Sequence, residues 1–284
     1  MAQQLSLTVL VDNNTLIGQY FIGEPGLSFL METRGKKILF DTGYSDAFLA
    51  NAGKMGINLR DLDYVVLSHG HFDHTGGLLP LVNHLIEAKI NSIPHKVPQL
   101  IAHPWCFYPK PMSPLPNTGS LLNEGEVRRQ FPVNLSDKPV WITEDLVFLG
   151  EIPRKFSFER KKPGKRKIIL PDGSTEPELL LDDSALAFRA STGLVIITGC
   201  SHAGICNITE YACEVCGEDK VVDIIGGLHL LTPDQIRMKK TGEYLRDLHL
   251  KALHACHCTS LSSKIALATS CPLAEVGVGM RLEW

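Results

Sequence analysis

Residues 68–78 read SHGHFDHTGGL. This stretch places three imidazoles and one carboxylate among the six residues from His69 to His74. It directly follows an apolar run at residues 64–67, YVVL, which is typical of a buried strand. Two glycines after it open a helix-like stretch from Leu78 to Ala88. Histidine nitrogens and carboxylate oxygens are ligands of Zn, Mn and Fe, so the stretch predicts a metal-binding loop at the end of a strand.

The same residues resemble the signature of the metallo-β-lactamase superfamily. Two further segments are similar to elements of that family: residues 38–43, ILFDTG, and residues 194–202, LVIITGCSH. The resemblance runs through nearly the whole chain. It implies an α/β fold, a four-layer αββα sandwich, with one or two metal ions at the edge of the sheets. It also implies a metal-dependent enzyme.

The composition fits a globular enzyme. The chain has 284 residues, of which 44% are hydrophobic and 21% charged, and its net charge is −3. That charge gives no global basic field that would favour nucleic acid or an anionic membrane. No apolar run approaches the roughly 18 residues that a spanning helix needs, and the start MAQQ lacks the features of a signal peptide. We therefore expect a cytoplasmic protein without a membrane partner, and the net charge disfavours a nucleic-acid partner. The oligomeric state is left open.

We expect the eight cysteines to be reduced thiols, because the chain is long and shows no signal peptide. The close pairs Cys213/Cys216 and Cys256/Cys258 could form a structural Zn or Fe–S site only if they met in space. Cys213 and Cys216 fall on one face of an expected helix, residues 207–216. Small core residues are the simpler interpretation of that pair.

Strand and helix patterns alternate along the chain and no linker divides it, so we expect a single domain over residues 1–284. Between roughly 105 and 170 we expect an irregular, Pro-rich and basic insertion, because four prolines fall within residues 109–116. The expected strands lie at residues 5–11, 36–40, 64–67, 99–102, 140–149, 184–188, 194–198, 221–225, 252–256 and 275–282. The expected helices lie at residues 45–55, 78–88, 207–216, 232–248 and 261–268.

Further ligands must come from the second half of the chain. His202 follows the strand at 194–198, and His257 fits the final ligand position of the resembled family. Cys200 stands where most of that family has a bridging aspartate. Either its thiolate takes that role or a carboxylate does, and Asp183 is the candidate, with a solvated turn as the simpler alternative. The predicted metal ligands are His69, His71, Asp73, His74, Asp183, His202 and His257.

We expect one divalent ion on His69, His71 and His202, and a second on Asp73, His74 and His257 when both sites are filled. Two cations about 3.5–4 Å apart stabilise the attacking and leaving oxygens and lower the pKa of a bridging water. Zinc is the metal expected first, with manganese or iron as alternatives.

Four residues are assigned roles beside metal ligation. Asp73 is a catalytic candidate because its carboxylate can accept a proton from the attacking water. His229, at a strand end behind two glycines, is the second candidate, either as a ligand or as a substrate contact. We expect Asp41 and Cys200 to contact the ligating side chains rather than the metal, and Asp41 to orient a ligating imidazole.

Three further sequence segments resemble one subgroup of this superfamily: residues 198–207, TGCSHAGICN; residues 226–230, GGLHL; and residues 256–259, CHCT. They resemble the group named for 7,8-dihydropterin-6-methyl-4-(β-D-ribofuranosyl)aminobenzene-5′-phosphate synthase. That resemblance implies a transferase that displaces pyrophosphate on a pterin. We expect a hydrolase or transferase acting on a small molecule that carries phosphate or pyrophosphate. The alternatives are a nucleic-acid-processing nuclease and an iron-dependent redox enzyme of the same fold.

A basic run from Arg154 to Lys167 carries eight cationic side chains and one acid, Glu159. Arginine pairs with phosphate in a bidentate way, and lysine supplies a mobile point charge. One interpretation is a lid that grips phosphate, with Phe156 and Phe158 over a flat ring; the other is a solvated loop. The predicted substrate-binding side chains are Lys161, Lys162, Lys165 and Arg166.

Overall fold

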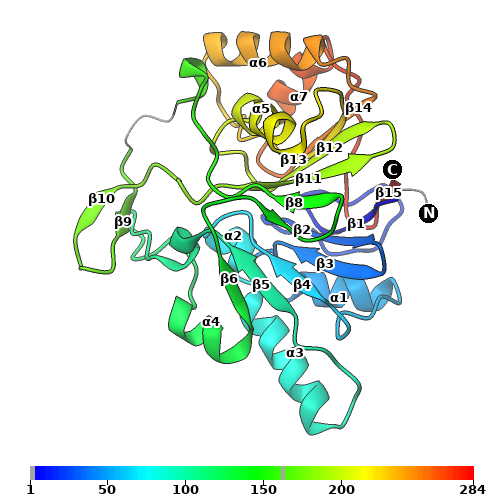
Figure 1. Cartoon of the computed structure of the whole chain (residues 1–284), viewed down its shortest axis with the longest axis vertical. Coiled ribbons are helices and arrows are strands. Elements are labelled where there is room, and N and C mark those ends of the chain that lie inside the picture. Colours follow the sequence, from blue (N-terminus) through cyan, green and yellow to red (C-terminus); the bar gives the residue numbers. More distant parts are fainter. Residues whose placement is uncertain (1–3, 161–163) are drawn as a thin grey trace.

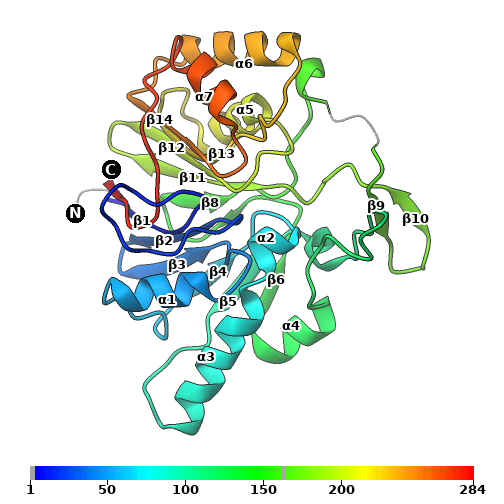
Figure 2. The ribbon, with the colours of Figure 1, turned by 180° about the vertical axis from the view of Figure 1, so that it is seen from behind.

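Two β-sheets pack face to face, and helices cover the outer face of each sheet (Figures 1 and 2). The computed structural model describes residues 4–160 and 164–284. One apolar core lies between the two sheets. Each sheet also has one apolar core between its outer face and the helices that cover it. These layers form the αββα sandwich that the sequence predicts, so the predicted fold is confirmed.

The first sheet has seven strands. In spatial order they are β15 (Arg281–Glu283), β1 (Ser6–Val11), β2 (Ser28–Thr33), β3 (Lys36–Phe40), β4 (Tyr64–Val66), β5 (Gln99–Ala102) and β6 (Val133–Leu135). Neighbours from β3 to β6 run parallel, so their carboxyl ends lie at one edge of the sheet. The outer face of this sheet packs against α1 (Ala47–Lys54) and α3 (Leu78–Ile90), while α2 (Phe72–Thr75) and α4 (Glu124–Gln130) lie in its connections.

The second sheet has six strands. In spatial order they are β14 (Ala252–Cys256), β13 (Val221–Gly227), β12 (Gly193–Thr198), β11 (Ala185–Ala190), β8 (Leu146–Phe148) and β7 (Val140–Trp141). Its outer face packs against α5 (Ile205–Cys216), α6 (Gln235–Asp247) and α7 (Leu261–Leu267). A separate hairpin of β9 (Lys167–Ile169) and β10 (Thr175–Pro177) projects beside the sandwich (Figure 1). Within the described ranges, no helix is long and apolar enough to span a membrane.

Strand β12 shows why the sandwich forms. Its sequence GLVIIT is buried along its whole length. Alternate side chains point to opposite faces of a strand. Val195 and Ile197 therefore enter the core between the sheets, whereas Leu194 and Ile196 pack under the helices. A strand covered on both faces needs a continuous apolar run rather than an alternating one.

The C-terminal strand is shorter than predicted. The expected strand at residues 275–282 is wrong, because only Arg281–Glu283 pairs with β1. Gly279 has a φ of 91°, a left-handed conformation that breaks the extended run. A Cβ at this position would lie 2.3 Å from the Phe21 ring, so the close approach also requires glycine.

The segment at residues 105–170 is more regular than expected. It contributes β6 to the edge of the first sheet and the hairpin of β7 and β8 to the edge of the second. Helix α4 begins with a full capping box, in which the Asn123 side chain accepts from the Glu126 N–H and Glu126 accepts from the Asn123 N–H. The prolines at residues 109–116 lie outside helices and strands, in the loop after the 3₁₀ turn Pro104–Phe107.

Candidate metal centre

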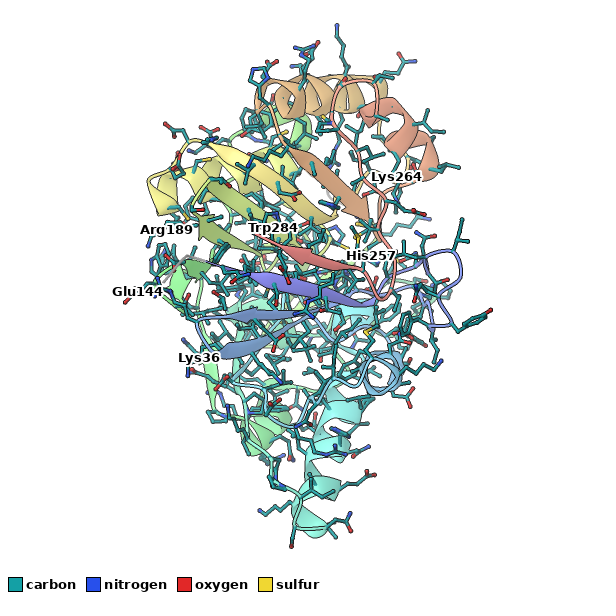
Figure 3. The ribbon with its side chains drawn as sticks, turned by 90° about the vertical axis from the view of Figure 1, so that its right-hand side faces the viewer. Lys36, Glu144, Arg189, His257, Lys264 and Trp284 are labelled. Carbon is teal, nitrogen blue, oxygen red and sulfur yellow. The ribbon has the colours of Figure 1, made fainter. Side chains whose placement is uncertain are left out.

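Six of the seven predicted ligands, all except Asp183, come together where carboxyl ends of strands from both sheets meet. The metal loop follows β4, and three further loops follow the parallel strands β12, β13 and β14. Figure 3 shows His257, which follows β14, at the boundary between the two sheets. Parallel strands place their following loops at one sheet edge, which is why residues far apart in sequence converge here. The side chains that these loops contribute are His69, His71, Asp73, His74, Cys200, His202, His229, His257 and Cys258.

One group of three buried imidazoles consists of His69, His71 and His202. Their candidate ligand atoms all lie within 4.8 Å of one another. The Nε2 atom of His69 is 3.0 Å from Nδ1 of His71, and the ring of His202 stands edge-on to both other rings. Burial lowers the pKa of His69, and the neighbouring imidazoles add to that effect. A neutral imidazole with its lone pair directed into the group is the form that ligates a metal.

A second group consists of Asp73, His74 and His257, again with ligand atoms within 4.8 Å of one another. The Nε2 atoms of His74 and His257 are 3.2 Å apart. A carboxylate oxygen of Asp73 lies 3.8 Å from the first of these nitrogens and 3.6 Å from the second. This set of one oxygen and two nitrogens fits a divalent cation.

Cys200 connects these two groups, and Asp183 does not. The Cys200 Sγ lies 3.2 Å from Nε2 of His74. It also falls within 4.8 Å of ligand atoms from both groups, including His69, His202 and His257. Asp183 is fully buried, and one of its oxygens accepts the backbone N–H of Ala203 at 2.8 Å. It joins none of the ligand groups among the described residues. The carboxylate instead holds the loop that carries His202.

His229 lies against the first group. Its ring centroid is 4.0 Å from that of His202, and its ligand atom is within 4.8 Å of those of Cys200 and His202. His229 and His257 have φ values of 48° and 49°, and Asp41 and Ser201 are also left-handed. Such conformations are costly for residues with a Cβ and tend to gather at functional sites. Here four of them surround one centre.

Asp41 orients the imidazole of His74 from behind. Its Oδ2 is 2.6 Å from His74 Nδ1, and both side chains are fully buried. The carboxylate also accepts the Ser68 N–H and hydroxyl, each at 2.7 Å. Burial lowers the pKa of His74, but Asp41 and Asp73 outweigh it and raise that pKa to about 9. A proton held on Nδ1 by Asp41 leaves Nε2 to face the metal position.

A buried ion pair fixes the metal loop from the other side. The Asp182 carboxylate accepts the Gly70 N–H at 2.9 Å and lies 3.0 Å from the Lys110 Nζ. Lys110 is fully buried and also donates to the carbonyl of Trp105 at 3.0 Å. A Cβ at Gly70 would lie 1.9 Å from the Cys106 carbonyl oxygen, so only glycine fits between the two loops. No sequence pattern indicates this pair, because its members are far apart in the chain.

The start of the basic run is part of the fold rather than a lid. Arg154 donates to the carbonyls of His202 at 3.1 Å and Leu180 at 2.6 Å. The buried Glu159 carboxylate accepts the N–H groups of Cys206 and Asn207, the first turn of α5. The rings of Phe156 and Phe158 pack against the core under the helices of the second sheet, so they do not cover the centre. This packing does not fit the interpretation in which the two rings cover a flat substrate ring.

Of the four predicted substrate-binding residues, Arg166 alone reaches the metal loop among those described. Its Nη1 lies 2.7 Å from Nε2 of His71, on the side of the ring that faces away from His69. The buried Glu178 carboxylate is 3.4 Å from the same nitrogen. Lys165 is exposed. Lys161 and Lys162 lie outside the described residues.

The cysteine pairs separate in space. Cys213 and Cys216 lie on α5 against the helix-side core, and Cys256 lies in the core between the sheets. Cys258 lies at the metal centre, where its sulfur joins Cys200 and His257 in one ligand group. All eight cysteines are free thiols. The position of Cys258 next to His257 at a strand end could have indicated its place at the metal centre. From the sequence we considered it only as the partner of Cys256.

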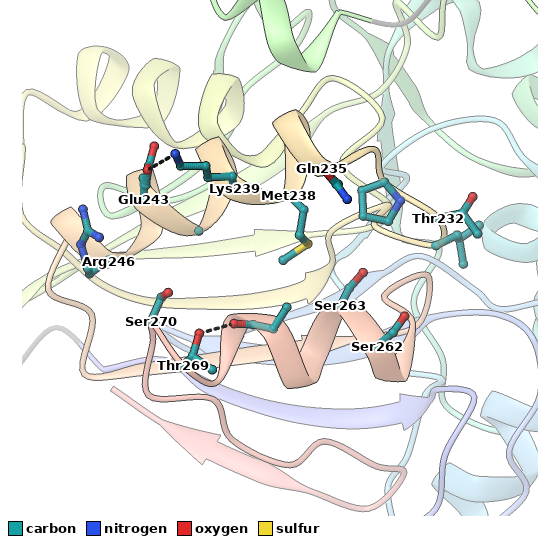
Figure 4. A pocket seen from close by; sticks show the side chains of 14 residues that line it. Thr232, Gln235, Met238, Lys239, Glu243, Arg246, Ser262, Ser263, Thr269 and Ser270 are labelled. Atoms are coloured by element: carbon teal, nitrogen blue, oxygen red, sulfur yellow. Dashed lines mark hydrogen bonds and ion pairs between the residues drawn. The ribbon is translucent and has the colours of Figure 1, made fainter.

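A groove of about 630 Å³ lies elsewhere, between α6 and α7 (Figure 4). Its walls combine apolar side chains such as Met238 and Leu231 with polar ones such as Lys239, Glu243 and Ser263. None of the predicted site residues lines this groove. The substrate is therefore sought at the metal loop and not here.

Comparisons with known proteins agree with this geometry. A family model described as the metallo-β-lactamase superfamily matches residues 22–211. The chain belongs to the metallo-β-lactamase superfamily. It is 34% identical over 256 residues to the 7,8-dihydropterin-6-methyl-4-(β-D-ribofuranosyl)aminobenzene-5′-phosphate synthase of Methanocaldococcus jannaschii, covering 86% of this chain and 84% of that one. The crystal structure of Tm1679, titled a metal-dependent hydrolase of the β-lactamase superfamily, has 28% identity and a TM-score of 0.80 over 98% of both chains.

A shorter match involves a nuclease. Ribonuclease Z of Methanopyrus kandleri is 44% identical over 57 residues, which is 20% of this chain and 19% of that protein. Members of the superfamily are generally metal-dependent enzymes that bind divalent ions. The buried convergence of imidazole, thiolate and carboxylate donors fits such ions. We therefore describe the chain as a metal-dependent enzyme of this superfamily.

Proposed function

We propose that the enzyme is a hydrolase or transferase that uses a dinuclear divalent centre on a small molecule carrying phosphate or pyrophosphate. The observation that carries this proposal is the pair of ligand groups, His69/His71/His202 and Asp73/His74/His257. The Cys200 sulfur lies within 4.8 Å of ligand atoms from both groups. Zinc is the proposed metal. The named synthase relative supports a pterin as the organic part of the substrate.

Two bound divalent ions would supply Lewis-acid stabilisation of charge on the reacting oxygens and a lowered pKa for the attacking group. The protein residues then divide the remaining work. Asp73 is about one quarter exposed at its carboxylate, so one oxygen can face substrate and accept a proton there. His229 contacts the same space from the side of His202 and can donate to a leaving oxygen. Asp41 keeps His74 in the required tautomer.

Arg166 is the proposed phosphate contact. Its guanidinium already lies at the edge of the metal loop, half-buried and 2.7 Å from His71. Arginine favours phosphate because its planar donors match two phosphate oxygens at once. Replacing Arg166 by Ala should raise the Michaelis constant for phosphorylated substrates without changing metal content. Arg129→Ala is the matched control, because Arg129 is an exposed arginine on α4 and belongs to none of the ligand groups.

The proposal is tested by a substrate panel on metal-loaded protein. The panel contains a phosphodiester, a pterin methyl pyrophosphate with and without an aromatic amine acceptor, and a short RNA. Phosphate or pyrophosphate release from the small molecules, lost in Asp73→Asn, supports the proposal. Acceptor-dependent pyrophosphate release identifies a transferase, and acceptor-independent release identifies a hydrolase. Turnover of RNA alone would replace the proposal with a nuclease.

A further inference from the structure

Two sulfur atoms lie at the centre, and only one of them has a role so far. The ligand atoms of Cys200, His257 and Cys258 all lie within 4.8 Å of one another. Two sulfurs bound to one tetrahedral ion, each about 2.3 Å from it, lie about 3.8 Å apart. The upper bound of 4.8 Å between the two sulfurs is compatible with shared ligation. Both thiols are buried, at 3% and 8% exposure.

The fold holds the Cys258 sulfur in this position from two sides. The backbone N–H of His229 donates to it at 3.2 Å, and an N–H donor stabilises a sulfur that carries negative charge. Gly227 lies on its other side, where a Cβ would come within 2.5 Å of the sulfur. Only glycine leaves room for the sulfur there. The sequence Gly226-Gly227-Leu228-His229 thus provides both the space and the donor.

Packing alone does not explain this arrangement. A small core cysteine makes apolar contacts, as Cys216 does on α5. Cys258 instead joins neither the helix-side cores nor the core between the sheets. Its neighbours are the polar atoms of the centre: the Cys200 carbonyl at 3.4 Å, the His229 N–H, and the ligand atoms of Cys200 and His257.

We propose that Cys258 is a metal ligand and shares with Cys200 the ion held by His74 and His257. This inference rests on the dinuclear centre of the proposed function and adds a thiolate to its second position. Soft thiolate ligands favour zinc, and also cobalt or iron, over manganese and magnesium. The centre is then a sulfur-bearing one that discriminates against hard cations, which a site of histidine and aspartate alone would not do to the same degree.

The test uses the full chain reconstituted with Co²⁺, because thiolate ligation gives a near-ultraviolet sulfur-to-cobalt charge-transfer band. The variants are Cys200→Ser, Cys258→Ser and the double variant, with Cys213→Ser as a matched control on α5, away from the centre. We expect the band per bound cobalt to fall about twofold in each single variant and to vanish in the double variant. The control should keep the full band.

A full band in Cys258→Ser with unchanged cobalt content would overturn the inference. Should Cys258→Ser fail to fold, Cys200→Ser decides, because Cys258 is then the remaining sulfur of the centre: a residual band supports the inference and no band refutes it. Failure of the proposed function looks different. Protein that binds cobalt with the expected band yet turns over no phosphorylated compound keeps the thiolate ligand and loses the proposed reaction. Protein that takes up no cobalt loses both.

Discussion

The buried pair of Lys110 and Asp182 should be essential for stability near the metal loop. Replacing Lys110 by Met keeps the length of the side chain and removes its charge. Asp182 is 1% exposed, so its carboxylate would stay buried without the Lys110 cation and would still accept the Gly70 N–H. Removing one partner of a buried ion pair costs about 3–5 kcal/mol. We expect a loss of that size in the free energy of unfolding.

The assay is urea unfolding at pH 7 in the presence of a chelator, so that metal binding does not contribute. Lys138→Met is the control, because the Lys138 side chain is 80% exposed and its loss should change the free energy by no more than about 0.5 kcal/mol. The double variant Lys110→Met/Asp182→Asn removes both charges and retains an acceptor for Gly70. It should recover about 1–3 kcal/mol relative to Lys110→Met.

The recovery is the decisive part of this experiment. A loss below about 1 kcal/mol in Lys110→Met would contradict the argument that the Asp182 charge is desolvated. A double variant less stable than Lys110→Met would show that Asp182 is stabilised by contacts other than Lys110. Either result would refute the assignment of this pair as the anchor between the metal loop and the loop at residues 104–110.

Three further predictions concern residues around the centre. Asp41→Asn should weaken metal binding about 10–100-fold in a chelator competition, because it removes the partner of His74; an unchanged affinity would contradict the orienting role. Gly70→Ala should prevent metal loading or folding, since its Cβ would lie 1.9 Å from the Cys106 carbonyl; a folded variant with normal metal content would show that this approach is not needed. Burial raises the pKa of Asp183 to about 6, although the Ala203 N–H and Arg154 act to lower it. The stability that the protonated Asp183 contributes is therefore fully present below about pH 4 and is lost as the pH rises through about 6. Asp183→Asn should therefore gain stability relative to the wild type between pH 4 and 7 and keep its metal content, whereas loss of one metal equivalent would place Asp183 among the ligands.

The sequence could predict the elements whose signal is local. The strands at residues 36–40, 99–102 and 252–256 appear with the expected bounds. The αββα fold was implied by the family resemblance of the metal loop and of the two further segments. Strand β2 at Ser28–Thr33 was missed. The predicted strand at 275–282 failed because Gly279 adopts a left-handed backbone, which the apolar pattern does not reveal.

The parts of the site that could not be predicted depend on long-range contacts. Lys110 meets Asp182, and Arg166 meets His71, across many residues of sequence. No local spacing encodes such a meeting. The sequence alone left open whether Cys200 or Asp183 takes the bridging role, because Cys200 follows one of two neighbouring strands and Asp183 precedes the other. In the structure the Cys200 sulfur joins both ligand groups, whereas the Asp183 carboxylate accepts the Ala203 N–H instead. Cys258 was hidden by its sequence neighbour Cys256, whose side chain points into the core between the sheets.

The metal content per chain tests the central claim most directly. We would measure it by mass spectrometry on protein purified without added metal, with His71→Ala as the test variant and His95→Ala as the matched control on the loop after α3. We expect about two equivalents of zinc per chain, retained in His95→Ala and reduced in His71→Ala. No bound metal in the wild-type protein, even after reconstitution with zinc, manganese and iron, would contradict it.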